Sequence, residues 1–373
     1  LQALVNLAAF RDDTLVRKML VIFAESRDLN GFTMAAWPRR VRSVIPSFSL
    51  SWIGMVHDYA LWRDDRGLIV SLMPGVRFLL DNLMAGMDSD GFLRGVDTAW
   101  NFIDWADDWH QKECFHVPPG MDESINATYN WLFVYTLRLA KKLEDYVGDS
   151  FLSARWDNAA TVLASKLQAR FWDSGRGLFN EDDSGRNFSE HAQVLSILSG
   201  YLEAPSLDRL KSSLFSEKEL AVCSIYYRHY FFEACRILNC PDAILSGLEL
   251  WNSFLAKGFH TAPETPENKT FNQRSDCHGW GSHPFYHLIA GLAGIRPAKM
   301  GFKKVLIAPL MGSLSEIDAK CYHPEGMIRV KLSKQGDQLH CHVSLPLTLP
   351  GEFRLGDSLI ELPPGEQSFT IEG

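Results

Sequence analysis

The segment 274–284 concentrates side chains that can do chemistry. It reads RSDCHGWGSHP, and its two central glycines argue against a regular helix. Loops held by a rigid scaffold are frequent carriers of function. A little upstream, the proline-flanked carboxylate Glu264 lies in the segment 261–267. A carboxylate can accept two sugar hydroxyls, and a tryptophan face can stack on the C–H side of a sugar ring. This loop region therefore favours carbohydrate chemistry.

Length and charge limit the class of protein. A chain of 373 residues exceeds a typical single core, so we expect a large domain and a small one. The net charge of −8, with no basic stripe, argues against nucleic acid as a partner. We find no apolar run of about 20 residues, so no membrane span is expected. Phosphate-binding glycine loops are also absent, which argues against nucleotide chemistry.

The cysteine pattern indicates neither disulfides nor a metal. The 7 cysteines show no CxxC spacing, and a disulfide framework is unusual in so large a chain. Cysteine and histidine are neighbours at 277–278 and at 340–342. Adjacent positions rarely suit one tetrahedral zinc site, so we expect no metal and no cofactor. Most of the 11 tryptophans should pack in the core, and the remainder could line a sugar-stacking groove.

Helical periodicity runs from residue 1 to about residue 295. The expected helices are Leu1–Phe10, Thr14–Ser26, Phe48–Trp62, Leu68–Met87, Ile125–Tyr146, Phe151–Phe171, His191–Leu202, Ala221–Leu238, Ala243–Phe254 and His283–Ile295. Asp122, Glu123 and Ser124 are capping candidates for the fifth of these. Helices in such alternation predict antiparallel hairpins. Hairpins of this kind can close into an (α/α)6 barrel, whose loops at one end form a cavity.

The pattern changes after Arg296-Pro297 to short runs separated by Pro, Gly and Asp. The expected strands are Gly301–Ala308, Ser315–His323, Met327–Leu332, Leu339–Leu345, Gly351–Leu355 and Gln367–Ile371. Their spacing predicts a small antiparallel β-sandwich. We therefore expect a mainly α barrel domain at 1–298 and a sandwich domain at 299–373, the second acting as a lid or buttress.

Several sequence blocks resemble the bacterial α-L-rhamnosidases of glycoside hydrolase family 78, over nearly the whole chain. They are Trp52-Ile-Gly-Met-Val-His57-Asp58-Tyr59, Trp62-Arg63-Asp64-Asp65, Trp100-Asn101-Phe102-Ile103-Asp104-Trp105-Ala106-Asp107, Arg274-Ser275-Asp276-Cys277-His278-Gly279-Trp280, Gly294-Ile295-Arg296-Pro297, Gly301-Phe302 and Ile307-Ala308-Pro309. The resemblance implies an (α/α)6 barrel followed by a C-terminal β-sandwich. It also implies inverting hydrolysis of terminal α-L-rhamnosides, with a rhamnose-containing glycan or glycoside as substrate.

The resemblance implies a glutamate base late in the barrel. Inversion needs two carboxyl groups about 6.5–9.5 Å apart, one protonating the leaving oxygen and one activating water. The position that matches the family's base is Glu264, although Pro263 stands where the family has a bulky residue. Glu267 is therefore a possible substitute, and an ordinary exposed loop acid is the plain alternative for Glu264.

The resemblance also implies sugar contacts. It assigns His278 to the sugar and makes Asp104 and Trp105 face the cavity, with Trp52 near the ring. A buried structural histidine, a helix cap at Asp104 and a core tryptophan at 52 are the competing interpretations. Four further candidates for substrate binding are Trp100, Asp276, Arg274 and Trp280. Asp276 could bind a hydroxyl or pair with Arg274. A nearby loop with His110, His116, Asp107 and Asp108 could shape the leaving-group side or be merely solvated.

The general acid is expected upstream of Leu1, because the family carries it just before the helix that opens this chain. The barrel would then lack its first helix. Its exposed flank would need the missing N-terminal part or a second copy of the chain. We therefore expect the isolated chain to be inactive. A non-catalytic sugar-binding fragment and an (α/α)6 hydrolase for a different glycan stay open as alternatives. The cellular compartment is not indicated.

Overall fold

The computed structural model describes residues 1–109, 116–265 and 275–372. Its contacts divide the chain into two compact units. The sheet unit comprises Leu1–Val16, Asp58–Asp65 and Cys235–Gly373, and the helical unit comprises Arg17–His57 and Arg66–Ala234. Helix α3 (Pro46–Trp62) and helix α9 (Arg228–Ile237) each run from one set of residues into the other.

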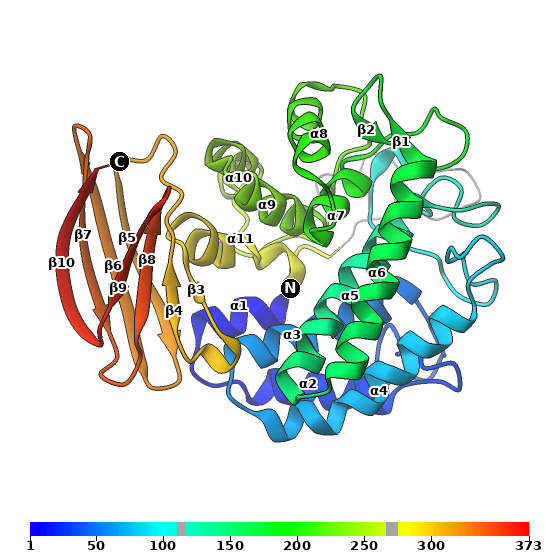
Figure 1. Cartoon of the computed structure of the whole chain (residues 1–373), viewed down its shortest axis with the longest axis horizontal. Helices are drawn as coiled ribbons and strands as arrows, with labels where there is room; N and C mark the ends of the chain where they lie inside the picture. The colour runs from blue at the N-terminus through cyan, green and yellow to red at the C-terminus, as the bar shows by residue number, and fades with distance from the viewer. Residues whose placement is uncertain (110–115, 266–274, 373) are drawn as a thin grey trace. The chain divides into compact units, whose positions relative to one another are not determined.

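The helical unit is built mainly from long amphipathic helices (Figure 1). Its elements are α2 (Thr14–Glu25), α4 (Arg66–Ala85), the short 3-10 helix η1 (Asp107–Trp109), α5 (Ala127–Val147), α6 (Ser150–Phe171), α7 (Glu190–Ser199), α8 (Ala204–Ser216) and the two-residue strands β1 (Trp172–Asp173) and β2 (Leu178–Phe179). Helix α8 was not expected from the sequence. Few of its residues are buried, so its apolar pattern is weak.

Helices α5 and α6 form the predicted antiparallel hairpin and lie side by side (Figure 1). The turn between them follows from two residues, Gly148 and Asp149. Gly148 adopts a left-handed conformation that ends α5, and Asp149 caps α6 by accepting a hydrogen bond from the Leu152 N–H. The cap of α5 is Asn126, which accepts from the Tyr129 N–H at 2.7 Å. The prediction that Asp122, Glu123 or Ser124 caps this helix is wrong, because the cap is Asn126. The Asp122 carboxylate instead accepts from Asn101 Nδ2.

Helix α4 is long and apolar enough to cross a membrane, judged by length and composition alone. The sequence-based statement that no such run exists is corrected here. Part of the helix is buried against its neighbours. Ile69, Val76 and Leu80 are among its buried residues, and Arg77 pairs with the buried Glu144 of α5.

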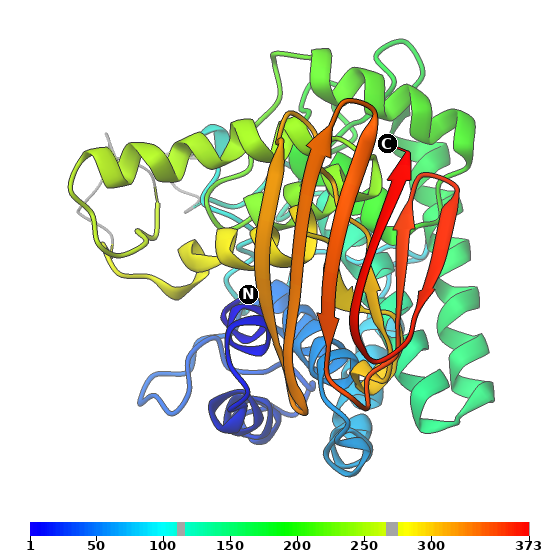
Figure 2. The same ribbon diagram turned by 90° about the vertical axis from the view of Figure 1, so that its left-hand side faces the viewer.

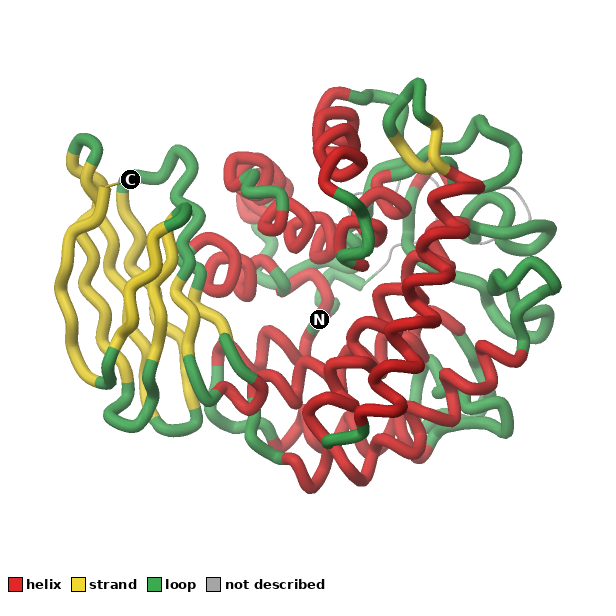
Figure 3. Tube along the Cα trace, in the orientation of Figure 1, coloured by secondary structure: helices red, strands yellow, loops and turns green. Residues whose placement is uncertain are grey.

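The sheet unit contains two four-stranded sheets (Figures 2 and 3). One has the order β10-β7-β6-β5 and the other the order β3-β4-β8-β9. The strands are β3 (Ile295–Pro297), β4 (Val305–Ile307), β5 (Glu316–His323), β6 (Gly326–Gln335), β7 (Gln338–Leu345), β8 (Gly351–Leu355), β9 (Ser358–Leu362) and β10 (Gly365–Glu372). The Phe353 and Phe369 rings, 5.1 Å apart, join the two sheets into a sandwich.

Helices complete the sheet unit. They are α1 (Gln2–Ala9), α10 (Pro241–Ala256), the 3-10 helices η2 (Gly279–Ser282) and η4 (Met300–Phe302), the one-turn α11 (Pro284–Tyr286) and the π-helix η3 (His287–Leu292). Helix α1 packs on β5, where the Cys321 thiol lies 3.8 Å from the Ala8 carbonyl oxygen. The apolar side of α1 is thus buried within this unit.

Three details of the predicted sheet unit are corrected. Strand β4 pairs with β8 in parallel, so the sandwich is not wholly antiparallel. The predicted strand Gly301–Ala308 is strand only at Val305–Ile307, because Gly301 has a positive φ of 74° in a 3-10 turn. The predicted helix His283–Ile295 is a short α turn followed by a π-helix, and it stops before Ile295 pairs in β3.

Candidate functional site

Two segments of the predicted catalytic loop lie against each other in the sheet unit. The Glu264 N–H donates to the Ser275 carbonyl oxygen and the His278 N–H donates to the Ala262 carbonyl oxygen, both at 2.8 Å. Gly281 permits this approach, since a Cβ at that position would lie only 2.7 Å from the Pro263 carbonyl oxygen. The pairing brings the sequence-predicted Glu264 and His278 into one cluster.

The Glu264 side chain is half-buried. The backbone of Glu264 also binds the indole of Trp280. Trp280 Nε1 donates to the Glu264 carbonyl oxygen at 2.9 Å. The Ser275 N–H approaches carboxylate Oε2 of Glu264 at 3.3 Å. The carboxylate is therefore positioned by the backbone of the adjacent segment, while the Trp280 ring is fixed at its edge.

His278 lies against the Trp280 ring, with 4.0 Å between the ring centroids. Partial burial lowers the pKa of this imidazole, and the negative charge of Glu264 opposes that shift. His278 therefore stays neutral to a lower pH than a free imidazole does. Its Nδ1 accepts from the Trp280 N–H at 3.5 Å, so in the neutral ring the Nε2–H remains to donate to a sugar hydroxyl.

The effect of the Glu264 charge on the pKa of His278 can be tested, because the direction of the expected change is defined. Replacing Glu264 by glutamine removes the charge that raises the pKa of His278, so that pKa should fall further. An NMR titration of the imidazole C–H signals measures the change. Glu249→Gln, an exposed glutamate of α10, is the matched control and should leave the pKa of His278 where it is. A rise, or no movement, in Glu264→Gln would contradict the coupling.

The candidates at 274 and 276 in the predicted loop are, respectively, outside the described residues and exposed. Asp276 and Cys277 are exposed, and the Asp276 carbonyl oxygen accepts from Thr261 Oγ1 at 2.5 Å. Arg274 and the alternative base Glu267 lie outside the described residues. The proposed pairing of Asp276 with Arg274 is therefore not addressed by the structure.

In the helical unit, Asp104 is completely buried and already fully engaged. Its Oδ2 lies 2.7 Å from His191 Nε2 and accepts from the Ser224 N–H at 2.7 Å. The Ser224 hydroxyl makes a short contact with Oδ1. This arrangement differs from the competing interpretation of a helix cap. Asp104 ties its loop to α7 and to the segment before α9, so its geometry is that of an anchor.

That anchored loop carries an aromatic cluster. The Trp100 and Trp105 rings are 5.7 Å apart, and the His116 ring is 4.8 Å from that of Trp105. Both tryptophans lie in a loop and not in a helix. Trp105 is buried and Trp100 half-buried.

The remaining residues of the helical unit that the sequence suggested as candidates differ in their burial. Trp52 is buried, and its Nε1 donates to the Leu20 carbonyl oxygen at 3.1 Å. Asp107 and Asp108 are exposed in η1, whereas His110 lies outside the described residues.

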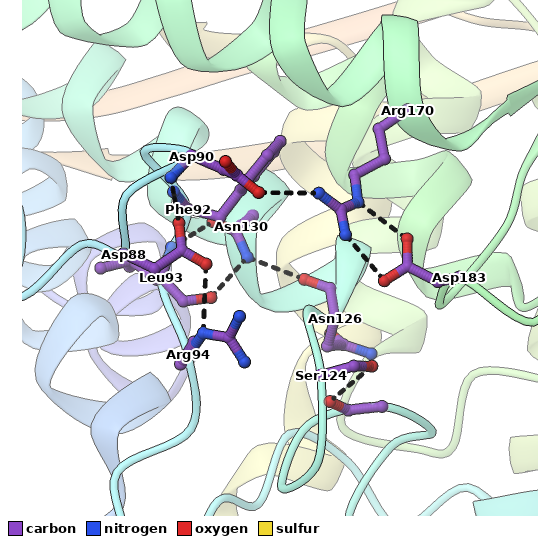
Figure 4. A network of polar contacts seen from close by, with 11 residues as sticks. Asp88, Asp90, Phe92, Leu93, Arg94, Ser124, Asn126, Asn130, Arg170 and Asp183 are labelled. Atoms are coloured by element: carbon purple, nitrogen blue, oxygen red, sulfur yellow. Dashed lines mark hydrogen bonds and ion pairs between the residues drawn. The ribbon is translucent and has the colours of Figure 1, made fainter.

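A second polar network fixes the turn that leads into the aromatic loop (Figure 4). Asp88 accepts from the backbone of Asp90 and Phe92, and the Asn130 side chain exchanges hydrogen bonds with the backbone of Leu93. Arg170 of α6 makes a bidentate contact with Asp183. Through Asn130, the segment that connects α4 to Trp100 is hydrogen-bonded to α5.

Sequence reasoning missed the partners of Asp104. His191 is buried in α7 and Ser224 follows it far along the chain. Tyr227 also packs on His191, with ring centroids 4.9 Å apart. No local pattern marks these residues, because they meet Asp104 only through the fold.

Comparison with known proteins identifies the family. The model of the bacterial alpha-L-rhamnosidase 6 hairpin glycosidase domain matches residues 1–222. The chain belongs to this family. The model of the bacterial alpha-L-rhamnosidase C-terminal domain matches residues 294–356 of the same chain. The predicted fold class, a six-hairpin α-barrel with a β-sandwich, is thereby confirmed.

Solved structures support the fold at low sequence identity. The family 78 rhamnosidase of Bacillus sp. GL1 aligns with a TM-score of 0.84 at 21% identity, covering 95% of this chain and 38% of that one. The α-L-rhamnosidase of Aspergillus terreus gives 0.78 at 14%, covering 95% and 43%. The Streptomyces avermitilis α-L-rhamnosidase complexed with L-rhamnose gives 0.73 at 16%, covering 99% and 37%. The chain thus spans less than half of each, and no curated protein matches it.

Proposed function

We propose that the protein carrying this chain hydrolyses terminal α-L-rhamnosides with inversion, and that Glu264 is its general base. The observation that carries the proposal is the cluster of Glu264, His278 and Trp280 in a chain of the rhamnosidase family. A half-buried carboxylate that accepts from one backbone N–H, that of Ser275, can take a proton from water. An inverting hydrolase also needs a second carboxyl group as acid, and this proposal assigns only the base.

In this proposal the neighbouring residues bind the sugar. The neutral imidazole of His278 donates from Nε2–H to a ring hydroxyl, and Trp280 offers an apolar face beside it. Asp276 is exposed and can accept from hydroxyls, with Arg274 proposed as a further contact. The substrate is a rhamnose-containing glycan or glycoside.

For the candidate residues of the helical unit, we propose roles according to the contacts that each side chain makes. Trp100 and Trp105 are proposed to stack on sugar rings. Asp104 is proposed to act by holding the loop of these tryptophans, because its oxygens are occupied by His191 and Ser224. Trp52 is buried and donates to the Leu20 carbonyl oxygen, so a role in packing is proposed for it. Residues 1–298 are proposed as the catalytic domain and residues 299–373 as its buttress.

Calorimetric titration with L-rhamnose tests the proposal. We expect binding that weakens about tenfold, or ~1.4 kcal/mol, in His278→Ala, as for a lost hydrogen bond. His260→Ala, an exposed histidine outside the cluster, should bind as the parent does. Equal binding by the parent and His278→Ala would overturn the assignment of the site. Binding without hydrolysis of any aryl rhamnoside would favour the sugar-binding alternative over the enzyme.

A further inference from the structure

Strand β7 presents two histidines on one face of its sheet. Leu339, Cys341 and Val343 are buried, whereas His340 and His342 alternate with them and point away from the sandwich core. Figure 2 shows the sheet of β5, β6, β7 and β10 from this side. The alternation separates Cys341 from its two neighbours. The histidines stand about 6.5–7 Å apart along the strand, as residues i and i+2 do.

Each imidazole is held by a hydroxyl of the adjacent strand. In the register of β7 with β10, His340 lies opposite Thr370 and His342 opposite Ser368. His340 Nδ1 lies 3.0 Å from Thr370 Oγ1, and His342 Nδ1 lies 3.0 Å from Ser368 Oγ. Among the described residues, neither Nε2 has a hydrogen-bond partner.

This repeated contact has a chemical consequence. When the proton is on Nδ1, the ring N–H donates to the hydroxyl oxygen and the Nε2 lone pair stays available. Metal-binding histidines are typically oriented in this way, through a hydrogen bond from the second ring nitrogen. Two such rings side by side on a strand form a pair of matched nitrogen donors.

The surroundings can accommodate a cation. The histidines line a depression of about 840 Å³ that also includes Glu316, Asp318 and Lys331. Lys331 lies opposite His342, but its ammonium pairs with Asp318 at 3.2 Å. The positive charge nearest the pair is therefore compensated, and Glu316 adds a negative one.

We propose that His340 and His342 form a two-histidine binding site for a divalent transition-metal ion, with water in the remaining coordination positions. Imidazole nitrogen suits Cu²⁺, Ni²⁺ and Zn²⁺, and affinity should follow the order Cu²⁺ above Ni²⁺ and Zn²⁺. Because strand geometry brings the two side chains together, the site depends on the folded sheet. The proposal does not rest on the proposed rhamnosidase activity.

Nickel titration on the whole chain tests the site. Cys277 is an exposed thiol, so the parent for the test is Cys277→Ser. We expect this parent to bind Ni²⁺ with a stoichiometric component that both His340→Ala and His342→Ala weaken at least tenfold. Paramagnetic broadening of backbone NMR signals from β7 and β10 should locate the ion. Thermal unfolding without metal checks that both variants are folded, as expected for exposed or half-buried positions.

Control variants separate the site from unspecific binding. His260→Ala should bind as the parent does, because this exposed histidine lies outside the sheet. Thr370→Val should keep both ligands but weaken binding several-fold, since it removes the group that orients His340. Unchanged affinity in both β7 variants, or broadening confined to other segments, would overturn the proposal.

Discussion

Replacing Glu264 by glutamine is expected to lower kcat for an aryl α-L-rhamnoside by about 10²–10⁴-fold, the usual contribution of a general base. Glutamine keeps the size of the side chain and an oxygen that can accept from the Ser275 N–H. The loop should therefore keep its conformation, and KM should change little. The measurement uses the shortest form of the protein that hydrolyses the aryl rhamnoside measurably.

Two further variants make this result decisive. Glu249→Gln removes an exposed carboxylate of α10 from the same unit and should leave kcat unchanged. If Glu264→Gln is as active as the parent while Glu267→Gln is not, the base is the alternative carboxylate predicted from the sequence. The L-rhamnose titration of His278→Ala then still reports separately on the sugar site.

Replacing Arg77 by alanine is expected to destabilise the chain by about 3 kcal/mol, the lower end for breaking a buried ion pair. Arg77 donates to both oxygens of Glu144, at 2.9 and 2.6 Å, and the Glu144 side chain is 0% exposed. Trp156 Nε1 lies 3.3 Å from the same carboxylate. Loss of Arg77 leaves this buried charge without its cation. The lower end applies because Arg77 itself is 31% exposed.

Denaturant unfolding measures this effect, with Lys141→Ala as the control. Lys141 belongs to the same helix α5 as Glu144, but its partner Asp145 is 51% exposed. Its removal should therefore change the free energy of unfolding by less than about 1 kcal/mol. In addition, Arg77→Leu combined with Glu144→Leu should recover much of the loss, since no buried charge remains. Equal stability of Arg77→Ala and Lys141→Ala would contradict the expected importance of the buried pair.

Local patterns predicted most of the fold. The hairpin of α5 and α6 follows from its helical periodicity and from Gly148 and Asp149 between the two helices. Elements with few buried residues were not predicted from the sequence. Helix α8 buries only Leu210, Ser213 and Leu214, and strand β9 buries only Leu362. The parallel pairing of β4 with β8 depends on contacts distant in sequence, which periodicity does not encode.

The candidate site was predictable only where its residues are neighbours in sequence. Glu264 and His278 lie in polar segments that contain proline or glycine, and the resemblance to the family assigns one to the base and the other to the sugar. The surroundings of Asp104 were not predictable, because His191 and Ser224 reach it from α7 and from the segment before α9. The pair of His340 and His342 was predictable in part. The sequence shows the two residues, but only the strand register supplies Thr370 and Ser368.

During synthesis, helix α1 is made long before strand β5, on which it packs. The helix ends at Ala9, and strand β5, on which it packs, begins at Glu316, about 300 residues later. At about 5–20 residues per second, the ribosome needs roughly 15–60 s to deliver that strand. During this interval Leu4 and Leu7, buried in the finished unit, lack their final cover. In the nascent chain, helix α1 should therefore be accessible to chaperones during this interval, and slower translation would lengthen that exposure.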